Sequence, residues 1–260
     1  MRYLITGGAG FIGSHLAEHL VAAGHDVTVL DDLSSGRRTN LASVRRRIRF
    51  LRGSVTDANM CRRAMEGIEC VLHHAAVTSV QQSVDDPLSA HQVNATGTLN
   101  VLLTARAAGV RRVVYAGSTS AYGNPATLPN TEDHVTRPLS PYAASKLGGE
   151  DYCIALHATY GLETVVLRYF NIFGPRQDPN SQYAAVVPRF IAVRYWQKQL
   201  RGPIGTVAIA PHMRATRGTE LPVLRADVRH LVAGHGPTPH LDLLLDDRHG
   251  PHPETHLTDP

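Results

Sequence analysis

The chain has 260 residues, of which 43% are hydrophobic and 18% are charged. This length and composition allow a full buried core, and they require no more than one domain with a small appendage. We take the formal net charge of +4 to be too small and too scattered to indicate a nucleic-acid partner. No apolar run approaches the roughly 20 residues that a membrane span needs, so we expect no membrane partner.

The three cysteines, Cys61, Cys70 and Cys153, are an odd number without metal-ligand spacing. They favour reduced structural thiols in a cytoplasmic protein. The first strand is expected within two residues of the amino terminus, which leaves no room for a signal peptide. The sequence therefore predicts a cytoplasmic protein without a bound metal.

Short apolar strands alternate with amphipathic helices up to about residue 175. In chain order we predict a strand at 3–5, a helix at 12–23, strands at 27–30, 48–51 and 71–73, a helix at 87–108, a strand at 113–116, a helix at 142–160 and a strand at 164–167. Gly24, Gly109 and Gly161 follow the three helices, where a left-handed residue commonly ends a helix. The alternation predicts an α/β fold with a Rossmann-like, doubly wound parallel sheet.

A glycine-rich turn separates the first strand from the first helix. In it, Gly7, Gly10 and Gly13 have the context of a dinucleotide-binding loop. Gly7 permits the tight turn, Gly10 lets the backbone approach a pyrophosphate, and Gly13 lets the helix pack on the strand. The amino end of the helix would supply N–H groups and a partial positive charge to the phosphates.

Asp31 ends the second strand, about 18 residues past the last glycine of the loop. A carboxylate in this position holds the adenine ribose hydroxyls and repels a 2′-phosphate. Arg37 and Arg38 are the opposing signal, because arginine in this loop can accept that phosphate. We give Asp31 more weight and expect NAD rather than NADP.

Tyr142 and Lys146 lie one turn apart on the third predicted helix and therefore on one face of it. There a lysine ammonium can stabilise a phenolate and lower the tyrosine pKa from about 10. Ser118 follows the fifth strand at the carboxyl edge of the sheet, where doubly wound folds bind ligands. Together these residues predict a tyrosine general base beside a bound dinucleotide.

These motifs together resemble the extended short-chain dehydrogenase/reductase family, and within it the NAD-dependent nucleotide-sugar 4-epimerases of the UDP-glucose epimerase type. The resemblance extends from residue 1 to about residue 193 and includes segments 94–98, 167–177 and 178–191. It implies oxidation at C4 of a UDP-hexose to a 4-keto sugar and re-reduction from the other face. A nucleotide-sugar 4,6-dehydratase is the alternative enzyme. Such dehydratases typically carry an Asp-Glu pair where this chain has Thr119 and Ser120, which lack acid/base strength at neutral pH.

The resemblance also implies a role for each matching residue. Tyr142 would be the general base, Lys146 would bind the nicotinamide ribose and activate it, and Ser118 would hydrogen-bond the reacting oxygen. Substrate contacts would come from Ser118, Thr119, Ser120, Tyr142 and Asn171. NAD contacts would come from Gly7, Gly10, Phe11, Ile12, Gly13, Asp31, Asp32, Ser35, Gly36, Val55, Ala75, Ala76, Thr78, Asn94, Tyr142, Lys146 and Phe170.

The chain departs from the family pattern at two places. Ser54 stands where an acidic residue usually reaches the adenine amino group. After about Val193, the family's Gly-Asp-Gly and Arg-Asp-Phe segments are missing. No aromatic residue follows Trp196, and seven of the 15 histidines and eight of the 16 prolines lie after Leu200. We interpret this part as a shifted reading frame or truncation, with a divergent lobe as the alternative.

We therefore predict an NAD-binding, Rossmann-like domain over residues 1–175 and an abbreviated substrate-binding lobe over residues 176–260, poorly ordered after about residue 200. A catalytically impaired NAD-binding fragment stays open as a third interpretation. The family resemblance implies a homodimer through the helices at 87–108 and 142–160. The apolar side chains that we assign to its interface are Val101, Leu102, Ala105, Cys153 and Leu156.

Overall fold

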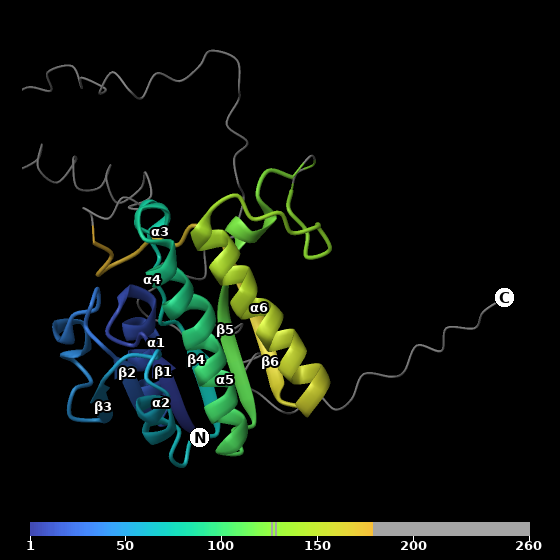
Figure 1. The fold of residues 1–260 in the computed structure, drawn as a ribbon. Helices are drawn as coiled ribbons and strands as arrows, with labels where there is room; N and C mark the ends of the chain where they lie inside the picture. The colour runs from blue at the N-terminus through green and yellow to red at the C-terminus, as the bar shows by residue number, and fades with distance from the viewer. Residues whose placement is uncertain (126, 128, 179–260) are drawn as a thin grey trace, which may run out of the picture. The chain divides into compact units, whose positions relative to one another are not determined.

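The computed structural model describes residues 1–125, 127 and 129–178 (Figure 1). The strands are β1 (Arg2–Thr6), β2 (Asp26–Asp31), β3 (Ile48–Arg52), β4 (Cys70–His73), β5 (Arg112–Ser118) and β6 (Glu163–Tyr169). The helices are α1 (Phe11–Ala22), α2 (Ala58–Ala64), α3 (Val80–Asp85), α4 (Pro87–His91), α5 (Gly97–Ala107) and α6 (Pro141–Tyr160). The short helices α2 and α3 were not predicted from the sequence.

The six strands form one parallel sheet in the order β3-β2-β1-β4-β5-β6. The chain winds outward from β1 through β2 and β3, and then in the other direction through β4, β5 and β6. The order reverses between β1 and β4, where Thr6 and His73 are partners in the register. Doubly wound sheets bind ligands outside the carboxyl ends of the strands at this switch point. The predicted Rossmann-like fold is therefore confirmed, and it positions the candidate site.

Helices cover the sheet on both faces. α1 contacts β1 and β2 on one face, and α2, α5 and α6 cover the other face (Figure 1). The main core cluster joins side chains of the second face, such as Leu4 and Leu30, to Cys61 of α2 and Cys153 of α6. All three cysteines are buried and none is in a disulfide bond, in keeping with structural thiols.

The helix predicted over residues 87–108 consists of α4, a π-helical turn (Gln92–Thr96) and α5 in direct succession. Its start is explained by Asp86, whose side chain accepts a hydrogen bond from the N–H of Ser89. α6 begins in the same way, with the Ser140 hydroxyl accepting from the N–H of Ala143. It ends at Gly161, which has a φ of 70° in the left-handed region.

The interface residues that we assigned to a homodimer are wrong. Val101, Leu102, Ala105 and Cys153 are fully buried, and Leu156 is 6% exposed, all within the core of the same chain. The helical spacing of these apolar residues marks the stripe that packs on the sheet. The exposed large apolar side chains of α4, α5 and α6 are instead Leu88, Leu103, Tyr152, Ile154 and Tyr160.

No helix within residues 1–125, 127 and 129–178 is long and apolar enough to cross a membrane. In the same part of the chain, no group of three or more histidine, cysteine or acidic side chains could hold a metal ion. The predicted substrate-binding lobe, the histidine-rich segment and the proposed frame shift lie almost wholly outside the described residues.

Candidate active site

There is no space for a side chain at Gly7 and Gly8 of the loop between β1 and α1, or at Gly13 in the first turn of α1. Gly7 has a φ of +68°, and a Cβ there would lie 2.7 Å from the backbone N of Ala75. A Cβ on Gly13 would lie 2.3 Å from the carbonyl O of Gly7. A Cβ on Gly10 would meet only that same oxygen, at 3.1 Å. Packing therefore requires glycine at positions 7 and 13, whereas position 10 leaves the backbone open to a phosphate.

The amino end of α1 directly follows this glycine loop. Gly10 precedes the helix in an extended conformation, and no side chain caps it. The first N–H groups of a helix have no acceptor within the helix and carry the positive end of its dipole. Phe11 and Ile12, both half-buried, begin this first turn. The loop and helix thus fit a dinucleotide pyrophosphate, as the sequence predicts.

Asp31 is buried at the end of β2 and accepts one hydrogen bond from the glycine loop and one from the loop that follows β2. Its Oδ2 accepts from the N–H of Ala9 at 2.9 Å, and its Oδ1 accepts from the N–H of Leu33 at 2.8 Å. Burial raises the pKa of Asp31, and the two backbone N–H groups oppose that shift. Each carboxylate oxygen has a second lone pair, so Asp31 can accept ribose hydroxyls while it anchors the loop. A Cβ on Gly36 would lie 2.9 Å from Oδ1, which places Gly36 against this carboxylate.

The two arginines that compete with Asp31 for cofactor choice have partners of their own. The guanidinium of Arg38 lies over the Phe50 ring, 4.6 Å from its centroid. The exposed Arg37 side chain reaches Asp178 at 4.0 Å. These contacts compete with a 2′-phosphate for both guanidinium groups and therefore favour Asp31 as the selecting residue.

Buried hydrogen bonds connect the two strands at the switch point. His73 Nδ1 is 2.6 Å from Thr6 Oγ1, and His73 Nε2 is 2.9 Å from Thr98 Oγ1. Thr98 donates its single hydroxyl proton to the carbonyl of Asn94, so it accepts from His73 Nε2–H, and Nδ1 must accept from Thr6. Thr6 Oγ1 accepts in turn from the backbone N–H groups of the two residues after His73. These partners hold His73 in its neutral Nε2–H form, and burial lowers its pKa well below the ordinary value.

Asn94 connects the loop after β4 to α6. It is fully buried in the π-helical turn, a feature that often marks functional sites. Its Oδ1 accepts from the N–H of Val77 at 2.8 Å, and its Nδ2 donates to the Val77 carbonyl and to Ser145 Oγ. Ser145 donates to the carbonyl of Tyr142 at 2.8 Å. Asn94 thus positions both segments, and its cofactor contact stays a prediction.

Tyr142 and Lys146 occupy the first two turns of α6, which packs against β5 and the turn that follows it. The N–H of Tyr142 donates to Ser83 Oγ of α3 at 2.9 Å. Lys146 is only 4% exposed, and burial lowers its pKa to about 7. Its ammonium lies 4.3 Å from the centroid of the Tyr115 ring, an attractive cation–π contact. The lysine is therefore held in a weakly hydrated, aromatic setting.

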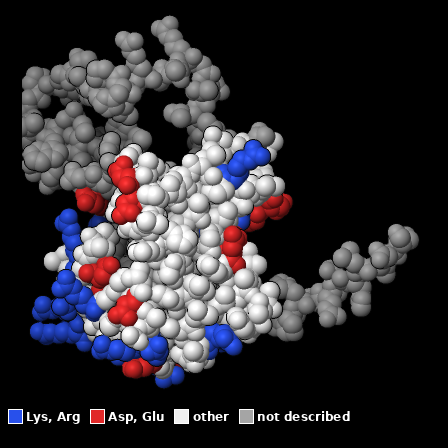
Figure 2. All heavy atoms as spheres, viewed as in Figure 1, with Lys and Arg blue, Asp and Glu red and all other residues white. Residues whose placement is uncertain are grey.

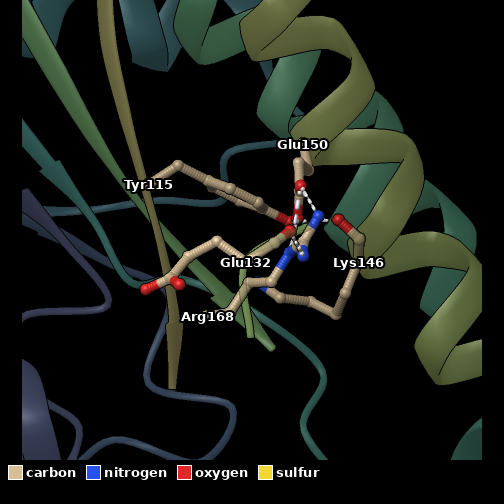
Figure 3. A network of polar contacts seen from close by, with 5 residues as sticks. All are labelled: Tyr115, Glu132, Lys146, Glu150 and Arg168. Atoms are coloured by element: carbon tan, nitrogen blue, oxygen red, sulfur yellow. Dashed lines mark hydrogen bonds and ion pairs between the residues drawn. The ribbon is translucent and has the colours of Figure 1, made fainter. Parts of the chain in front are cut away.

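A partly buried ion pair supports the same helix (Figure 3). Arg168 Nη2 of β6 lies 2.6 Å from Glu150 Oε1 of α6, and Arg168 Nη1 donates to the carbonyl of Glu132 at 3.2 Å. The Tyr115 hydroxyl donates to the Lys146 carbonyl at 3.0 Å. The side chain of Glu150 is 6% exposed, and its carboxylate raises the pKa of Arg168 further. These contacts connect β5, β6 and the loop before α6 to the turn that carries Lys146.

Ser118 ends β5 and is 7% exposed. Its Oγ accepts from the N–H of Ser120 at 3.2 Å, a bond that leaves the hydroxyl proton available to a ligand. Thr119 begins the 3₁₀ turn Thr119–Tyr122 and donates to the carbonyl of Tyr169 at 3.1 Å. Ser118 is thus placed at the carboxyl edge of the sheet as predicted.

The segment after β6 reaches the amino-terminal half of α1. His15 Nε2 lies 3.0 Å from the carbonyl of Pro175, and Arg176 bonds Ser14 Oγ and pairs with Glu18. Phe170, which is 47% exposed, and Asn171, which is also exposed, precede these contacts. This path brings the predicted substrate-binding segment to the same edge of the sheet as the glycine loop.

Of the remaining predicted cofactor residues, one lies in the core and the others lie in loops at or near the surface. Val55 is buried in the main core cluster, and Ser54 accepts from the N–H and the hydroxyl of Thr56. The others line the loops after β2 and β4, at or near the surface: Asp32, Ser35, Ala75, Ala76 and Thr78. A Cβ on Gly7 would lie 2.7 Å from the backbone N of Ala75, so Ala75 lies beside the glycine loop. The cofactor contacts of all these residues stay predictions.

Sequence reasoning missed the residues that support the site. These are chiefly Thr6, His73, Tyr115, Glu150 and Arg168. Only Glu150 carried a usable signal, because it follows Lys146 by four residues and so lies on the same helix face. The partners of the others are distant in the chain and follow from the strand order.

The sheet, the glycine loop and the tyrosine–lysine helix define a dinucleotide-binding protein of the short-chain dehydrogenase/reductase type. The chain belongs to the NAD dependent epimerase/dehydratase family, whose model matches residues 3–202.

Known relatives are similar over the same region. A UDP-glucose 4-epimerase of Mycolicibacterium smegmatis is 44% identical over 190 residues, covering 72% of this chain and 61% of the relative. The structure of Thermus thermophilus UDP-glucose 4-epimerase in complex with NAD matches with a TM-score of 0.67 at 43% identity, over 72% of this chain and 60% of that one. DesIV, a dTDP-glucose 4,6-dehydratase from Streptomyces venezuelae with NAD and TYD bound, matches with a TM-score of 0.70 at 37% identity, over 76% and 63%. The chain thus spans about three-fifths of the length of the relatives that it matches.

Proposed function

We propose that this chain carries the cofactor-binding and catalytic part of an NAD-dependent nucleotide-sugar 4-epimerase that acts on a UDP-hexose. The main support is the placement of Tyr142 and Lys146 at the start of α6, which packs on the end of β5 beside Ser118. This constellation lies at the same sheet edge as the glycine loop. A base, its activating cation and a hydroxyl donor are therefore available beside the dinucleotide site.

The cofactor proposal rests on the fit of the loop. Gly7 and Gly13 bring the backbone close to the pyrophosphate position, the amino end of α1 favours its charge, and Asp31 offers oxygens to the adenine ribose. A nicotinamide ring bound at this edge would supply the acceptor for the hydrogen that leaves C4 and would later return it. NAD is favoured over NADP because the Asp31 carboxylate repels a 2′-phosphate.

Tyr142 moves the proton in the proposed reaction. Its phenolate oxygen accepts the proton of the C4 hydroxyl as C4 is oxidised, and returns that proton when C4 is reduced from the opposite face of the 4-keto sugar. Ser118 donates its free hydroxyl proton to the same sugar oxygen. The tyrosine therefore ends each turnover in the state in which it began.

Lys146 supplies the charge that makes a phenolate accessible near neutral pH. Burial lowers the pKa of Lys146 to about 7. A phenolate beside this ammonium would stabilise the protonated lysine, and the positive charge would stabilise the phenolate in turn. Activity requires this ammonium together with a deprotonated Tyr142. We therefore expect activity to fall as the pH rises and Lys146, whose pKa is about 7, loses its proton.

A dehydratase is the second candidate, since a dTDP-glucose 4,6-dehydratase is among the similar structures. Elimination of water across C5 and C6 needs an additional acid and base near the sugar. The turn after Ser118 offers Thr119 and Ser120, and the Thr119 hydroxyl already donates to the Tyr169 carbonyl. Hydroxyl groups are poor acids and bases at neutral pH, which favours epimerisation.

Turnover by the chain as it stands should be poor, although NAD should bind. The predicted NAD-binding and catalytic residues precede Val193, where the family's nucleotide-pocket segments fail to appear. The loss of contacts to the nucleotide removes binding energy that positions C4 of the sugar. We therefore expect a lower kcat and a higher KM.

Two measurements on the purified chain test the proposal. Isothermal titration with NAD should show binding, and failure to bind would contradict the cofactor assignment. Incubation with UDP-galactose should yield traces of UDP-glucose, whereas a 4-keto-6-deoxy sugar would assign a dehydratase. A kcat near the enzyme median of about 10 s⁻¹ would contradict the expected impairment.

We also propose a homodimer, with an interface different from our first assignment. A shallow groove between the α4–α5 helix and α6 is lined by His91, Ala95, Ala144, Gly148, Asp151, Tyr152 and Ala155. Small residues in such a groove let helices approach closely, and Leu88 and Ile154 are exposed on the same helices. Light scattering should report a dimer at micromolar concentration, and Gly148→Arg should shift it to monomer. A wild-type monomer would refute the interface.

A further inference from the structure

The charge of the chain is concentrated in one segment. Nine arginines and a single carboxylate, that of Asp57, occur between residues 37 and 63. The rest of the chain up to residue 178 holds eight lysines and arginines against 14 acidic residues. The prediction that the excess charge is scattered is therefore wrong for this region. Positive charge gathers in one segment, and the remainder of this region is acidic.

The fold places this segment at one margin of the sheet. It comprises the 3₁₀ turn Arg38–Leu41, the edge strand β3 and the helix α2. In Figure 2 the basic side chains gather at the lower left, where β3 and α2 lie in Figure 1. We call this surface the arginine face. Its members are all exposed: Arg37, Arg38, Arg45, Arg46, Arg47, Arg49, Arg52, Arg62 and Arg63.

Internal contacts engage only some of these guanidinium groups. Arg49 pairs with Glu66 at 3.3 Å, and Arg47 donates to the carbonyl of Val21 at 2.7 Å. The side chains of Arg45 and Arg46 have no hydrogen-bond, ion-pair or ring partner among the described residues. Neither the fold nor the proposed reaction uses them. So many uncompensated like charges repel one another, and a polyanion would relieve that repulsion.

We propose that the arginine face binds an anionic phospholipid surface. Guanidinium groups form bidentate hydrogen bonds with phosphate, and clusters of four to eight basic residues bind acidic lipid headgroups. The face lies on an edge strand, so its side chains project from the sheet margin toward a partner that presents many phosphates. The chain would then be a peripheral protein, held at the membrane by charge.

A nucleic acid presents phosphates too, but the arginine face suits it less. Groove recognition commonly uses a helix or a strand ribbon that enters the groove, and the only helix of this face, α2, has seven residues. Single strands need aromatic rings for base stacking. Phe50 is the one aromatic residue between positions 37 and 63, and the guanidinium of Arg38 covers its ring.

The test is co-sedimentation of the full chain with lipid vesicles at about 0.1 M salt, where screening acts over about 10 Å. Vesicles of phosphatidylcholine mixed with phosphatidylglycerol should bind the chain, and vesicles of phosphatidylcholine alone should not. Each arginine near an anionic surface contributes about a fivefold factor. The triple variant Arg45→Gln, Arg46→Gln, Arg63→Gln should therefore bind about 100-fold more weakly.

A matched control removes the same charge elsewhere. The triple variant Arg2→Gln, Arg106→Gln, Arg137→Gln replaces three exposed arginines outside the face and should bind within about threefold of the wild type. Circular dichroism and NAD titration of both variants check that the fold and the cofactor site are unchanged, which separates this inference from the proposed function. The proposal would be overturned if both triple variants lost the same affinity for the anionic vesicles. It would also be overturned if the wild type bound neutral and anionic vesicles equally well. Tighter binding to duplex DNA at the same phosphate concentration would overturn it in favour of a nucleic acid.

Discussion

The glycine loop and the proposed catalytic turn of α6, residues 142–146, lie at one edge of the sheet, yet they are held there in different ways. The loop is fixed mainly by its own backbone: Gly7 donates to the carbonyl of Leu30, and Ala9 donates to Asp31, 22 residues away. The proposed catalytic turn depends on side chains that are more distant in the sequence. Ser83 and Asn94 contact it from 59 and 51 residues away. We therefore expect the loop to be destabilised when a side chain is added to one of its glycines. We expect the turn to be destabilised when a side chain that supports it is removed.

The largest expected effect is at the catalytic turn and leaves the loop untouched. Tyr142→Phe keeps the aromatic ring and removes only the ionisable hydroxyl, so turnover should fall by about 10²- to 10⁴-fold while NAD affinity is retained. A coupled assay of UDP-galactose conversion and an NAD titration measure the two quantities. Tyr152→Phe, a partly exposed tyrosine on the same helix, is the control and should change neither. Near-full turnover of Tyr142→Phe would contradict the assigned base.

The second prediction concerns the ion pair between Glu150 and Arg168, which supports α6. Glu150→Gln leaves the partly buried guanidinium of Arg168 without its carboxylate, which should lower the free energy of unfolding by about 2 kcal/mol. Urea denaturation measures this loss. The neighbouring Asp151→Asn, at an exposed position, should cost less than about 0.5 kcal/mol. Equal effects of the two substitutions would show that the ion pair does not support the helix.

Adding a methyl group tests the loop. A Cβ on Gly13 would overlap the backbone O of Gly7, whereas a Cβ on Gly148 of α6 would have its nearest contact at an ordinary 3.7 Å. Gly13→Ala should therefore destabilise the protein by about 1–3 kcal/mol and weaken NAD binding at least tenfold. Gly148→Ala should be neutral or stabilising by up to about 1 kcal/mol. Thermal unfolding with and without NAD distinguishes these outcomes.

The buried ammonium of Lys146 predicts a dependence of stability on pH. Its pKa is about 7 in the folded chain and 10.5 as the ordinary value, so between these values the unfolded chain binds more protons and stability rises with pH. Relative to Lys146→Met, the wild type should gain about 2 kcal/mol between pH 7 and pH 9. Urea denaturation of both proteins across that range measures the difference. A constant difference would mean that the ammonium is not buried.

The smallest predicted effect concerns cofactor choice at the loop. The Asp31 carboxylate should make NAD bind at least tenfold more tightly than NADP, equivalent to about 1.4 kcal/mol. Asp31→Asn keeps an oxygen that can accept from one backbone N–H but removes the negative charge. The ratio of NAD affinity to NADP affinity should therefore decrease. Titration of both proteins with both cofactors gives the ratios. Equal affinities in the wild type would mean that Arg37 and Arg38 dominate.

Local features of the sequence predicted the six strands, the three long helices and the glycine loop. An apolar run, a capping residue or a glycine acts on its immediate neighbours, so its effect can be read without the rest of the chain. The same reasoning failed for Val101 and Cys153, because helical periodicity identifies an apolar face without saying whether a sheet or a second subunit covers it. It also missed α2 and α3, which are too short for a periodic pattern.

By itself, the sequence determined the dinucleotide loop, the acidic end of β2 and the tyrosine–lysine pair, because each is a short pattern with its own chemistry. The tertiary structure alone decided what surrounds them. Strand order β1-β4-β5 brings His73 against Thr6 and places Tyr115 where its ring can meet the ammonium of Lys146. It also gathers nine arginines at the margin beyond β2. Such contacts join residues tens of positions apart, and only the folded chain specifies which of them meet.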